Sequence, residues 1–270
     1  MATTHNHTVY NNFVLANKFT DLLTTHINMN NYMTLDTSLT ETAGMKKKIN
    51  TYTATGNVED LTMGKGNTGE ISVSFTTSEY TVGVTQGKFQ YYDEQAMTDP
   101  AVVEMGLKAM SEKMSNDLTA KAITEYGKAT LKVEYETSVS FDTIVDAIAK
   151  LNTEDESGLY MLINPEMKAS LRKTLKDDLK YNSDIVTSGY IGSVAGVPII
   201  VSKAVPENTA FVAKKEAVTC YIKKTSEIEQ ERKPDTRDNV VYARKIMVVA
   251  LTDATKAVKI VKKVTQQAGS

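Results

Sequence analysis

Imidazole side chains are confined to the first part of the chain. All three histidines, His5, His7 and His26, lie within the first 26 residues. A Ser-His-Asp or Cys-His nucleophile system needs a histidine as its base, so residues 27–270 offer no base of this kind. His5 and His7 could supply two metal ligands, but two ligands on a polar terminus make a poor site, and a solvated tail is the better interpretation. We therefore predict no metal-binding residues.

The single cysteine, Cys220, lies in the apolar run 217–222. A free cysteine in such a run behaves as a small apolar residue, whereas reactive thiols occupy partly exposed, electropositive surroundings. One cysteine cannot form an intrachain disulfide, which fits synthesis in the cytoplasm. We expect Cys220 to be buried in a strand.

Two glycine-rich stretches have the composition of a phosphate-binding loop. The stretch 64–69 lacks the Gly-Lys-Ser/Thr ending of such a loop, and the residues after it alternate like a strand instead of opening a helix. The glycines at 189–196 likewise run into the β-branched segment Val197–Val201 and not into a helix, unlike a dinucleotide fingerprint. We predict no cofactor, and we interpret 64–69 as the tip of a hairpin.

Neighbouring carboxylates occur at 154–156 and 177–178, between or at the ends of the expected elements. Acidic residues in such places are usually solvated, and no spacing pairs them across a cleft. We therefore predict no catalytic residues and no enzymatic activity. The alternative is a hydrolase or transferase that uses only carboxylates and lysines. This alternative predicts a pocket whose ionisable side chains have shifted pKa values.

Length and composition describe a foldable chain with balanced charge. The 270 residues include 41% hydrophobic and 24% charged side chains, as in globular proteins. A formal net charge of −2 argues against a dedicated nucleic-acid-binding protein, which usually carries a basic excess. The mean hydropathy of −0.28 and the lack of a long apolar run exclude a membrane helix. The first residues also lack the basic and apolar regions of a secretory signal.

Residue periodicity divides the chain into an arm, a hairpin, a long helix and a mixed region. Residues 1–45 are rich in Asn and Thr, and residues 46–92 favour strands with a glycine-rich reversal. From Pro100 to Tyr126, apolar residues recur at spacings of three and four, which predicts a helix about 40 Å long. The other expected elements are helices at 140–151 and from Asn164-Pro165 onward, and strands at 158–163, 197–201, 210–213, 218–222, 240–249 and 258–264. Together they predict an α+β protein.

The hairpin contains a change of phase. Apolar residues alternate in one phase up to Phe75 and in the other phase from Tyr80 onward. Because strand side chains have a period of two, this change predicts a bulge or a short break near 76–79. A hairpin with so few large apolar residues is marginal in water, so it needs a partner surface.

Four stretches follow one another along the chain. They are the glycine-tipped hairpin at 46–91, Asp93-Glu94 before the helix 100–126, Leu162-Ile163-Asn164-Pro165 before Ser170-Leu171-Arg172-Lys173, and the run 189–202. In this order they resemble the major capsid protein family of tailed bacteriophages, which has the Hong Kong 97-like fold. The four stretches are similar to that family's extended loop, spine helix, axial strand-to-helix step and glycine-rich axial segment.

The resemblance implies a Hong Kong 97-like α+β fold in four parts. They are an N-terminal arm (1–45), an extended β-hairpin loop (46–92), a peripheral domain that includes the spine helix (93–137 and 226–270), and a mixed α/β axial domain (138–225).

The function that the resemblance implies is structural. The chain would self-assemble into pentamers and hexamers of an icosahedral phage head that encloses double-stranded DNA, contacted without sequence specificity. It would be located in the virion, after assembly in the bacterial host cytoplasm, with no membrane partner. A portal and a separate scaffolding protein are also implied. The scaffolding protein is expected to be separate because only residues 1–45 precede the hairpin.

The hairpin tip and the arm are expected to contact neighbouring subunits. The residues expected there are Gly64, Lys65, Gly66, Asn67, Thr68 and Gly69 at the tip, with Phe13 and Phe19 in the arm. Some family members cross-link a hairpin lysine to an asparagine of another subunit, and Lys65 could take that role, although exposed loop lysines are common.

Encapsulin-type nanocompartments, which enclose a cargo enzyme, share this architecture and are the alternative. The Asn/Thr-rich terminus offers no obvious amphipathic cargo-docking helix, which favours the phage head.

Overall fold

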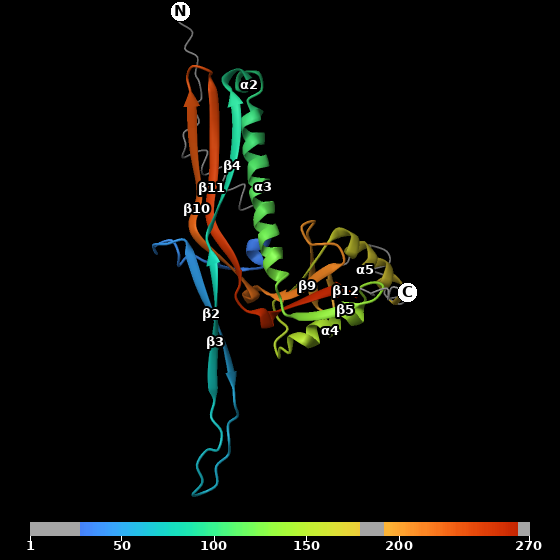
Figure 1. Cartoon of the computed structure of the whole chain (residues 1–270). Coiled ribbons are helices and arrows are strands. Elements are labelled where there is room, and N and C mark those ends of the chain that lie inside the picture. Colours follow the sequence, from blue (N-terminus) through green and yellow to red (C-terminus); the bar gives the residue numbers. More distant parts are fainter. Residues whose placement is uncertain (1–27, 179–191, 264–270) are drawn as a thin grey trace, which may run out of the picture.

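The computed structural model describes residues 28–178 and 192–263, and combines two sheets, a projecting hairpin and a long helix (Figure 1). The helices are α2 (Asp93–Thr98), α3 (Ala101–Tyr126), α4 (Phe141–Leu151) and α5 (Pro165–Asp178), with short 3₁₀ turns η1 (Asn28–Asn31), η2 (Lys215–Ala217) and η3 (Ala254–Lys256). The strands are β1 (Thr34–Asp36), β2 (Lys46–Thr55), β3 (Ser72–Thr81), β4 (Gly83–Tyr92), β5 (Leu131–Tyr135), β6 (Leu159–Ile163), β7 (Ser193–Val194), β8 (Val197–Val201), β9 (Thr209–Lys214), β10 (Val218–Lys233), β11 (Asp238–Leu251) and β12 (Ala257–Lys262). The α+β class is confirmed.

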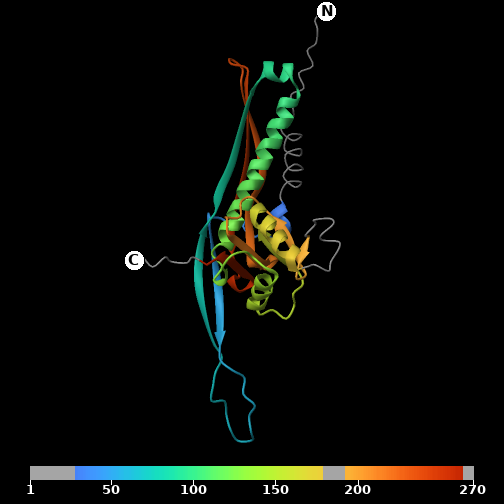
Figure 2. The same ribbon diagram turned by 90° about the vertical axis from the view of Figure 1, so that its right-hand side faces the viewer.

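A four-stranded sheet with the order β1-β10-β11-β4 supports the long helix α3. Strands β10 and β11 form a long antiparallel ladder, and α3 runs along it (Figures 1 and 2). The apolar stripe predicted for this helix is confirmed, because each of its members is buried: Val103, Leu107, Met110, Met114 and Leu118. Cys220 is buried in β10, as expected, and burial raises the pKa of its thiol.

The ends of α3 lie close to the predicted ones. The helix begins at Ala101, whose backbone N–H donates to Asp99 Oδ1 at 2.9 Å. It ends at Tyr126, and Gly127 follows in a right-handed conformation, φ −59°, with its N–H donating to the Ile123 carbonyl. Glycine often follows a helix because it adopts a left-handed backbone without strain, but the backbone at Gly127 is right-handed and does not require glycine.

Two glycines allow α3 to lie close to β4. A Cβ added to Gly106 of the helix would lie 2.3 Å from Phe89 Cζ on the strand, and one added to Gly87 of the strand would lie 2.6 Å from Met110 Cγ on the helix. Real Cβ atoms do not approach other atoms this closely. The separation of helix and sheet therefore depends on both glycines.

A six-stranded sheet, in the order β5-β12-β9-β6-β8-β7, has two apolar faces. One face, with Met161 and Val212, packs against α4 and α5. The residues next to these in sequence, Leu162 and Phe211, point to the opposite side and pack with Tyr126 at the end of α3. The alternation of strand side chains thus explains why a continuous apolar run forms this sheet.

Local signals start the two helices α4 and α5 where the sequence predicted. The Ser140 hydroxyl accepts from the Thr143 N–H at 3.3 Å, which starts α4 at Phe141. Asn164 Oδ1 accepts from the Met167 N–H at 2.9 Å at the start of α5.

Three strands pair in a different part of the structure from the one that the predicted domain division gives them. The division places β4 in the extended loop 46–92, but β4 pairs with β11 in the four-stranded sheet. The division groups 131–135 and 257–262 with the spine helix, but β5 and β12 pair in parallel with each other and β12 pairs with β9 in the six-stranded sheet. The boundaries at 137 and 226 therefore do not follow the sheets. Strand pairing is a contact between distant segments, which apolar periodicity does not specify.

Strands β2 and β3 form a two-stranded hairpin that projects away from both sheets (Figures 1 and 2). Their register is continuous from Lys46 opposite Thr81 to Thr55 opposite Ser72, so the predicted bulge near 76–79 is wrong. The phase change has another cause: near Tyr80 the chain's own sheet covers one face of the hairpin, whereas the apolar residues farther out lie on the other face.

Candidate assembly surfaces

One face of the projecting hairpin is apolar and exposed. Directly opposite residues of an antiparallel pair lie on the same face, and Tyr52 lies opposite Phe75, with ring centroids 6.0 Å apart. Val73 lies on this face two residues farther out. Tyr52, Phe75 and Val73 are 65%, 64% and 61% exposed. Beyond this cross-strand ring contact, a face this exposed adds little to the stability of a single copy.

The other face of the hairpin carries hydroxyl groups along its outer part. Its members are Thr51, Thr53, Thr55, Ser72, Ser74, Thr76 and Ser78. At the base of the same face, Ile49 and Tyr80 pack against Leu39, Val82 and Tyr221 of the chain itself. The hairpin is thus anchored through one face and presents its outer apolar residues on the opposite one.

Residues 56–71 form the tip loop of the hairpin, and Glu59 organises it. The Glu59 carboxylate accepts from the Thr68 backbone N–H at 2.9 Å and from the Thr68 hydroxyl at 2.7 Å. These hydrogen bonds lower the pKa of Glu59. Gly64 has φ +83°, a left-handed conformation that glycine adopts without strain.

All six tip residues predicted to contact neighbours, 64–69, lie in this loop and are exposed. Their contact with another subunit stays a prediction, and Phe13 and Phe19 lie outside the described residues. The sequence did not predict the hydrogen bonds between Glu59 and Thr68, because a pair of residues nine positions apart in a loop has no periodic signal. It also missed three exposed apolar side chains of the same loop: Val58, Leu61 and Met63.

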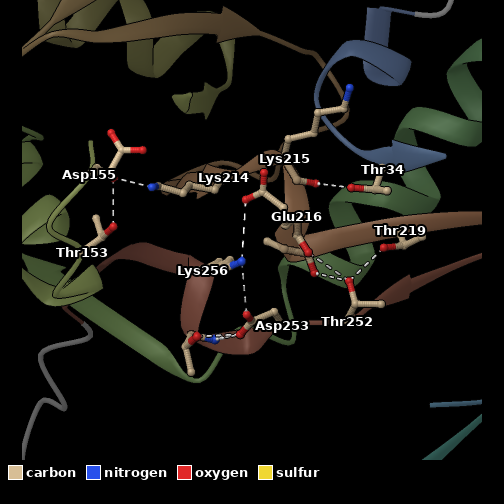
Figure 3. A network of polar contacts seen from close by, with 12 residues as sticks. Thr34, Thr153, Asp155, Lys214, Lys215, Glu216, Thr219, Thr252, Asp253 and Lys256 are labelled. Atoms are coloured by element: carbon tan, nitrogen blue, oxygen red, sulfur yellow. Dashed lines mark hydrogen bonds and ion pairs between the residues drawn. The ribbon is translucent and has the colours of Figure 1, made fainter. Parts of the chain in front are cut away.

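The two sheets meet at one joint, which polar contacts hold together (Figure 3). Strand β9 passes into β10 through η2, and β11 passes into β12 through η3. The Thr252 hydroxyl donates to the Glu216 carbonyl at 3.1 Å and lies 3.0 Å from the Thr219 hydroxyl. Lys256 Nζ lies 3.8 Å from Glu216 and 3.7 Å from Asp253. These contacts link the two sheets at the joint, in addition to the apolar core that they share.

A polar hollow beside this joint is lined by carboxylates and lysines, the residue types that the enzyme alternative requires. Its lining includes Asp155, Lys214, Glu216 and Lys256. Ser157 donates its backbone N–H and its hydroxyl to Asp155 at 2.9 and 2.7 Å, and these hydrogen bonds lower the pKa of Asp155. A general acid needs a raised pKa, so Asp155 is tuned in the opposite direction.

Within residues 28–178 and 192–263, no group of three or more His, Cys, Asp or Glu side chains is arranged to hold a metal ion. None of the helices in this part of the chain is both long and apolar enough to span a bilayer.

Sequence comparison identifies a family for the part of the chain that contains the long helix and most of the two sheets. A family model described as "Phage capsid protein" matches residues 75–260, which include α3, the four-stranded sheet except β1, and the six-stranded sheet except the last two residues of β12. The chain belongs to this phage capsid protein family. The match begins within β3, so the tip of the hairpin lies outside it.

A curated relative agrees with this phage capsid assignment. The "Major capsid protein" of Staphylococcus phage phiMR11 is 32% identical over 120 residues, which are 43% of this chain and 44% of the relative. The chain thus matches less than half the length of that relative.

Solved structures agree on the capsid fold. A structure described as Gordonia phage Cozz has a TM-score of 0.69 at 11% identity and covers 89% of this chain and 87% of its own. The virus-like particle from Pyrococcus furiosus has a TM-score of 0.64 at 11% identity and covers 91% and 97%. The fold is the Hong Kong 97-like capsid fold, as the sequence resemblance predicted.

Proposed function

We propose that the chain is a major capsid protein that self-assembles into pentamers and hexamers of an icosahedral phage head around double-stranded DNA. The observation that carries this proposal is the projecting hairpin, whose outer apolar residues Tyr52, Val73 and Phe75 are exposed on one face. A two-stranded hairpin is marginal alone, so such a face needs a surface supplied by another molecule. In an assembly of identical copies, each copy supplies that surface to the next.

The predicted parts have definite roles in such a shell. The arm (1–45) and the tip residues 64–69 contact neighbouring subunits, and the protein acts by assembly and not as an enzyme. We propose that the domain division follows the sheets, so that β5 and β12 belong with the axial residues 138–217. A separate scaffolding protein and a portal complete the head, which is formed in the host cytoplasm and becomes part of the virion.

The net charge of −2 suits a shell around DNA. A strongly basic inner surface would bind the phosphate backbone tightly, whereas a near-neutral protein encloses DNA with weak, non-specific contacts. The cargo-compartment alternative has the same fold, but the family match and the curated relative are both phage capsid proteins, which favours the phage head.

Negative-stain electron microscopy of the full chain, expressed alone and then with its neighbouring genes, tests the proposal. We expect closed shells or tubes in at least one sample. Portal, terminase and tail genes next to this one support the phage head, whereas a ferritin-like or peroxidase gene supports a cargo compartment. Uniformly small particles in both samples at high concentration contradict assembly and return attention to the hollow lined by Asp155 and Lys214.

A further inference from the structure

The two ends of the hairpin carry opposite charge. The tip loop, 56–71, contains three carboxylates and one lysine: Glu59, Asp60, Glu70 and Lys65. Glu59 is engaged with Thr68, while Asp60 and Glu70 are exposed. The tip therefore presents an excess of two negative charges.

The base of the hairpin is basic. Three lysines in succession, Lys46, Lys47 and Lys48, begin β2, and Lys223 of β10 lies beside them, with its Nζ donating to the Thr42 carbonyl at 2.6 Å. Glu79 pairs with Lys46 at 2.5 Å and with Lys48 at 3.9 Å, and Asp36 acts electrostatically on Lys47. Glu41 lies in the same segment, so four lysines stand against three carboxylates, Asp36, Glu41 and Glu79, which leaves one positive charge.

These charges cannot neutralise each other within one copy. The strands between them are ten residues long, and ten residues of antiparallel strand span about 34 Å. At physiological salt, exposed charges are largely screened beyond about 8 Å. The tip of one hairpin can therefore pair with a base only on another copy.

Exposed apolar side chains accompany the charges at both ends. Val58 and Met63 at the tip are 87% and 106% exposed, and Leu35 and Met45 at the base are 44% and 40% exposed. Both ends thus combine an apolar patch with charge of opposite sign, as complementary surfaces do.

We propose that the acidic tip of one copy's hairpin docks on the lysine-rich base of the next copy's hairpin, head to tail. This inference rests on the proposed shell function and names the contact within it. Because the two patches differ, the contact is heterologous, and it closes into a ring when the rotation between copies permits. The charges set the register of the hairpins, and the apolar residues around them exclude water.

Charge reversal tests the contact. D60K/E70K makes the tip basic, K46E/K48E makes the base acidic, and the quadruple variant restores opposite signs. Like charges across a contact are strongly unfavourable, so we expect each reversed chain to lose about tenfold or more in particle yield at low salt, and the quadruple variant to recover it. E154K/E156K, which reverses two exposed loop carboxylates elsewhere, is the matched control and should assemble as the original chain does.

Co-expression of the two reversed chains gives a sharper result. Each tip then finds an opposite charge only on the other chain, so rings close only with alternating copies and an even number of subunits. We expect six-fold rings to return in the mixture and five-fold rings to remain absent.

The outcomes separate this contact from the proposed function. If the original chain forms no particles, the shell proposal fails. If the original chain assembles but D60K/E70K assembles equally well, or the quadruple variant is not rescued, the tip-to-base contact is wrong and the shell proposal stands.

If circular dichroism shows that a reversed chain does not fold, the neutral variants D60N/E70Q and K46Q/K48Q replace it. We expect the particle yield of these neutral variants to be the same between about 0.1 and 1 M NaCl, because salt screens only charged contacts. A particle yield that still changes with salt would overturn the proposed contact.

Discussion

Tyr126 Oη lies 2.5 Å from Tyr160 Oη, and both hydroxyls also reach the carbonyl of Tyr32, at 2.9 and 2.5 Å. Tyr126 is the last residue of α3, Tyr160 lies in β6, and Tyr32 follows η1. The long helix, the six-stranded sheet and the segment before β1 thus meet at one carbonyl oxygen, that of Tyr32. Burial raises the pKa of both hydroxyls, which remain protonated donors at neutral pH.

Removing one hydroxyl from this cluster should destabilise the fold. Tyr160→Phe leaves the Tyr126 hydroxyl and the Tyr32 carbonyl bonded to each other but with one partner fewer, and the loss of a typical hydrogen bond costs about 0.5–1.5 kcal/mol. Urea unfolding of the variant should show this loss in the free energy of unfolding. Tyr52→Phe, at a 65% exposed position, is the control. Equal stabilities for the two variants would show that the cluster contributes nothing.

Gly106→Ala should separate α3 from β4. Alanine favours a helix over glycine by about 1 kcal/mol, so propensity alone predicts a more stable protein. The new Cβ would lie 2.3 Å from the Phe89 ring, and overpacking of this kind costs about 1–3 kcal/mol. We expect a lower melting temperature. Gly66→Ala, in open space at the hairpin tip, should change stability by less than about 0.5 kcal/mol, and a stabilised Gly106→Ala protein would contradict the packing argument.

Stability should decline in acid because of Glu227. Arg244 Nε and Lys224 Nζ lie 2.7 and 2.8 Å from its carboxylate and lower the pKa of Glu227 from 4.5 to about 2. A lowered pKa in the folded state contributes stability that is present above pH 4.5 and lost as the pH falls towards 2. Unfolding experiments across this range should show a shallower decline for Glu227→Gln than for the original chain. Glu207→Gln, at an exposed position, should keep the original slope.

The apolar face of the hairpin should matter for assembly and not for folding. Val73 and Phe75 are exposed, so V73T/F75T should change the free energy of unfolding by less than about 0.5 kcal/mol. If another copy covers this face, the same variant should lower particle yield in electron microscopy, because apolar burial at the contact is lost. Thr53→Val, on the hydroxyl face, should leave the yield unchanged. An unchanged yield for V73T/F75T would place the contact on another surface.

Signals that act within one or two turns were sufficient to predict α3, α4 and α5, whereas the short helix α2 was not predicted. The spacing of Leu107, Met114 and Leu118 predicted α3, and the Ser140 and Asn164 side chains predicted the starts of α4 and α5. Each signal joins residues a few positions apart, so both residues of the contact can be read in one short stretch of sequence. The order of these elements also carried the resemblance to phage capsid proteins.

The misinterpreted phase change in the hairpin illustrates the limit of such signals. The alternation around Phe75 and Tyr80 is real, but a change in the covered face and a bulge produce the same pattern. Only the position of the hairpin relative to the sheet that packs on Tyr80 distinguishes them.

The sequence by itself determined where α3, α4, α5 and most strands lie, that no histidine follows residue 26, and that opposite charges occur near 46–48 and 59–70. The tertiary structure decided that β5 pairs with β12, that Tyr126 meets Tyr160, and that the charges stand at the two ends of one straight hairpin. Periodicity, capping and turn chemistry act between near neighbours. Tyr126 and Tyr160 are 34 positions apart and Leu131 and Val258 are 127 positions apart, and the choice of such partners depends on how the whole core packs.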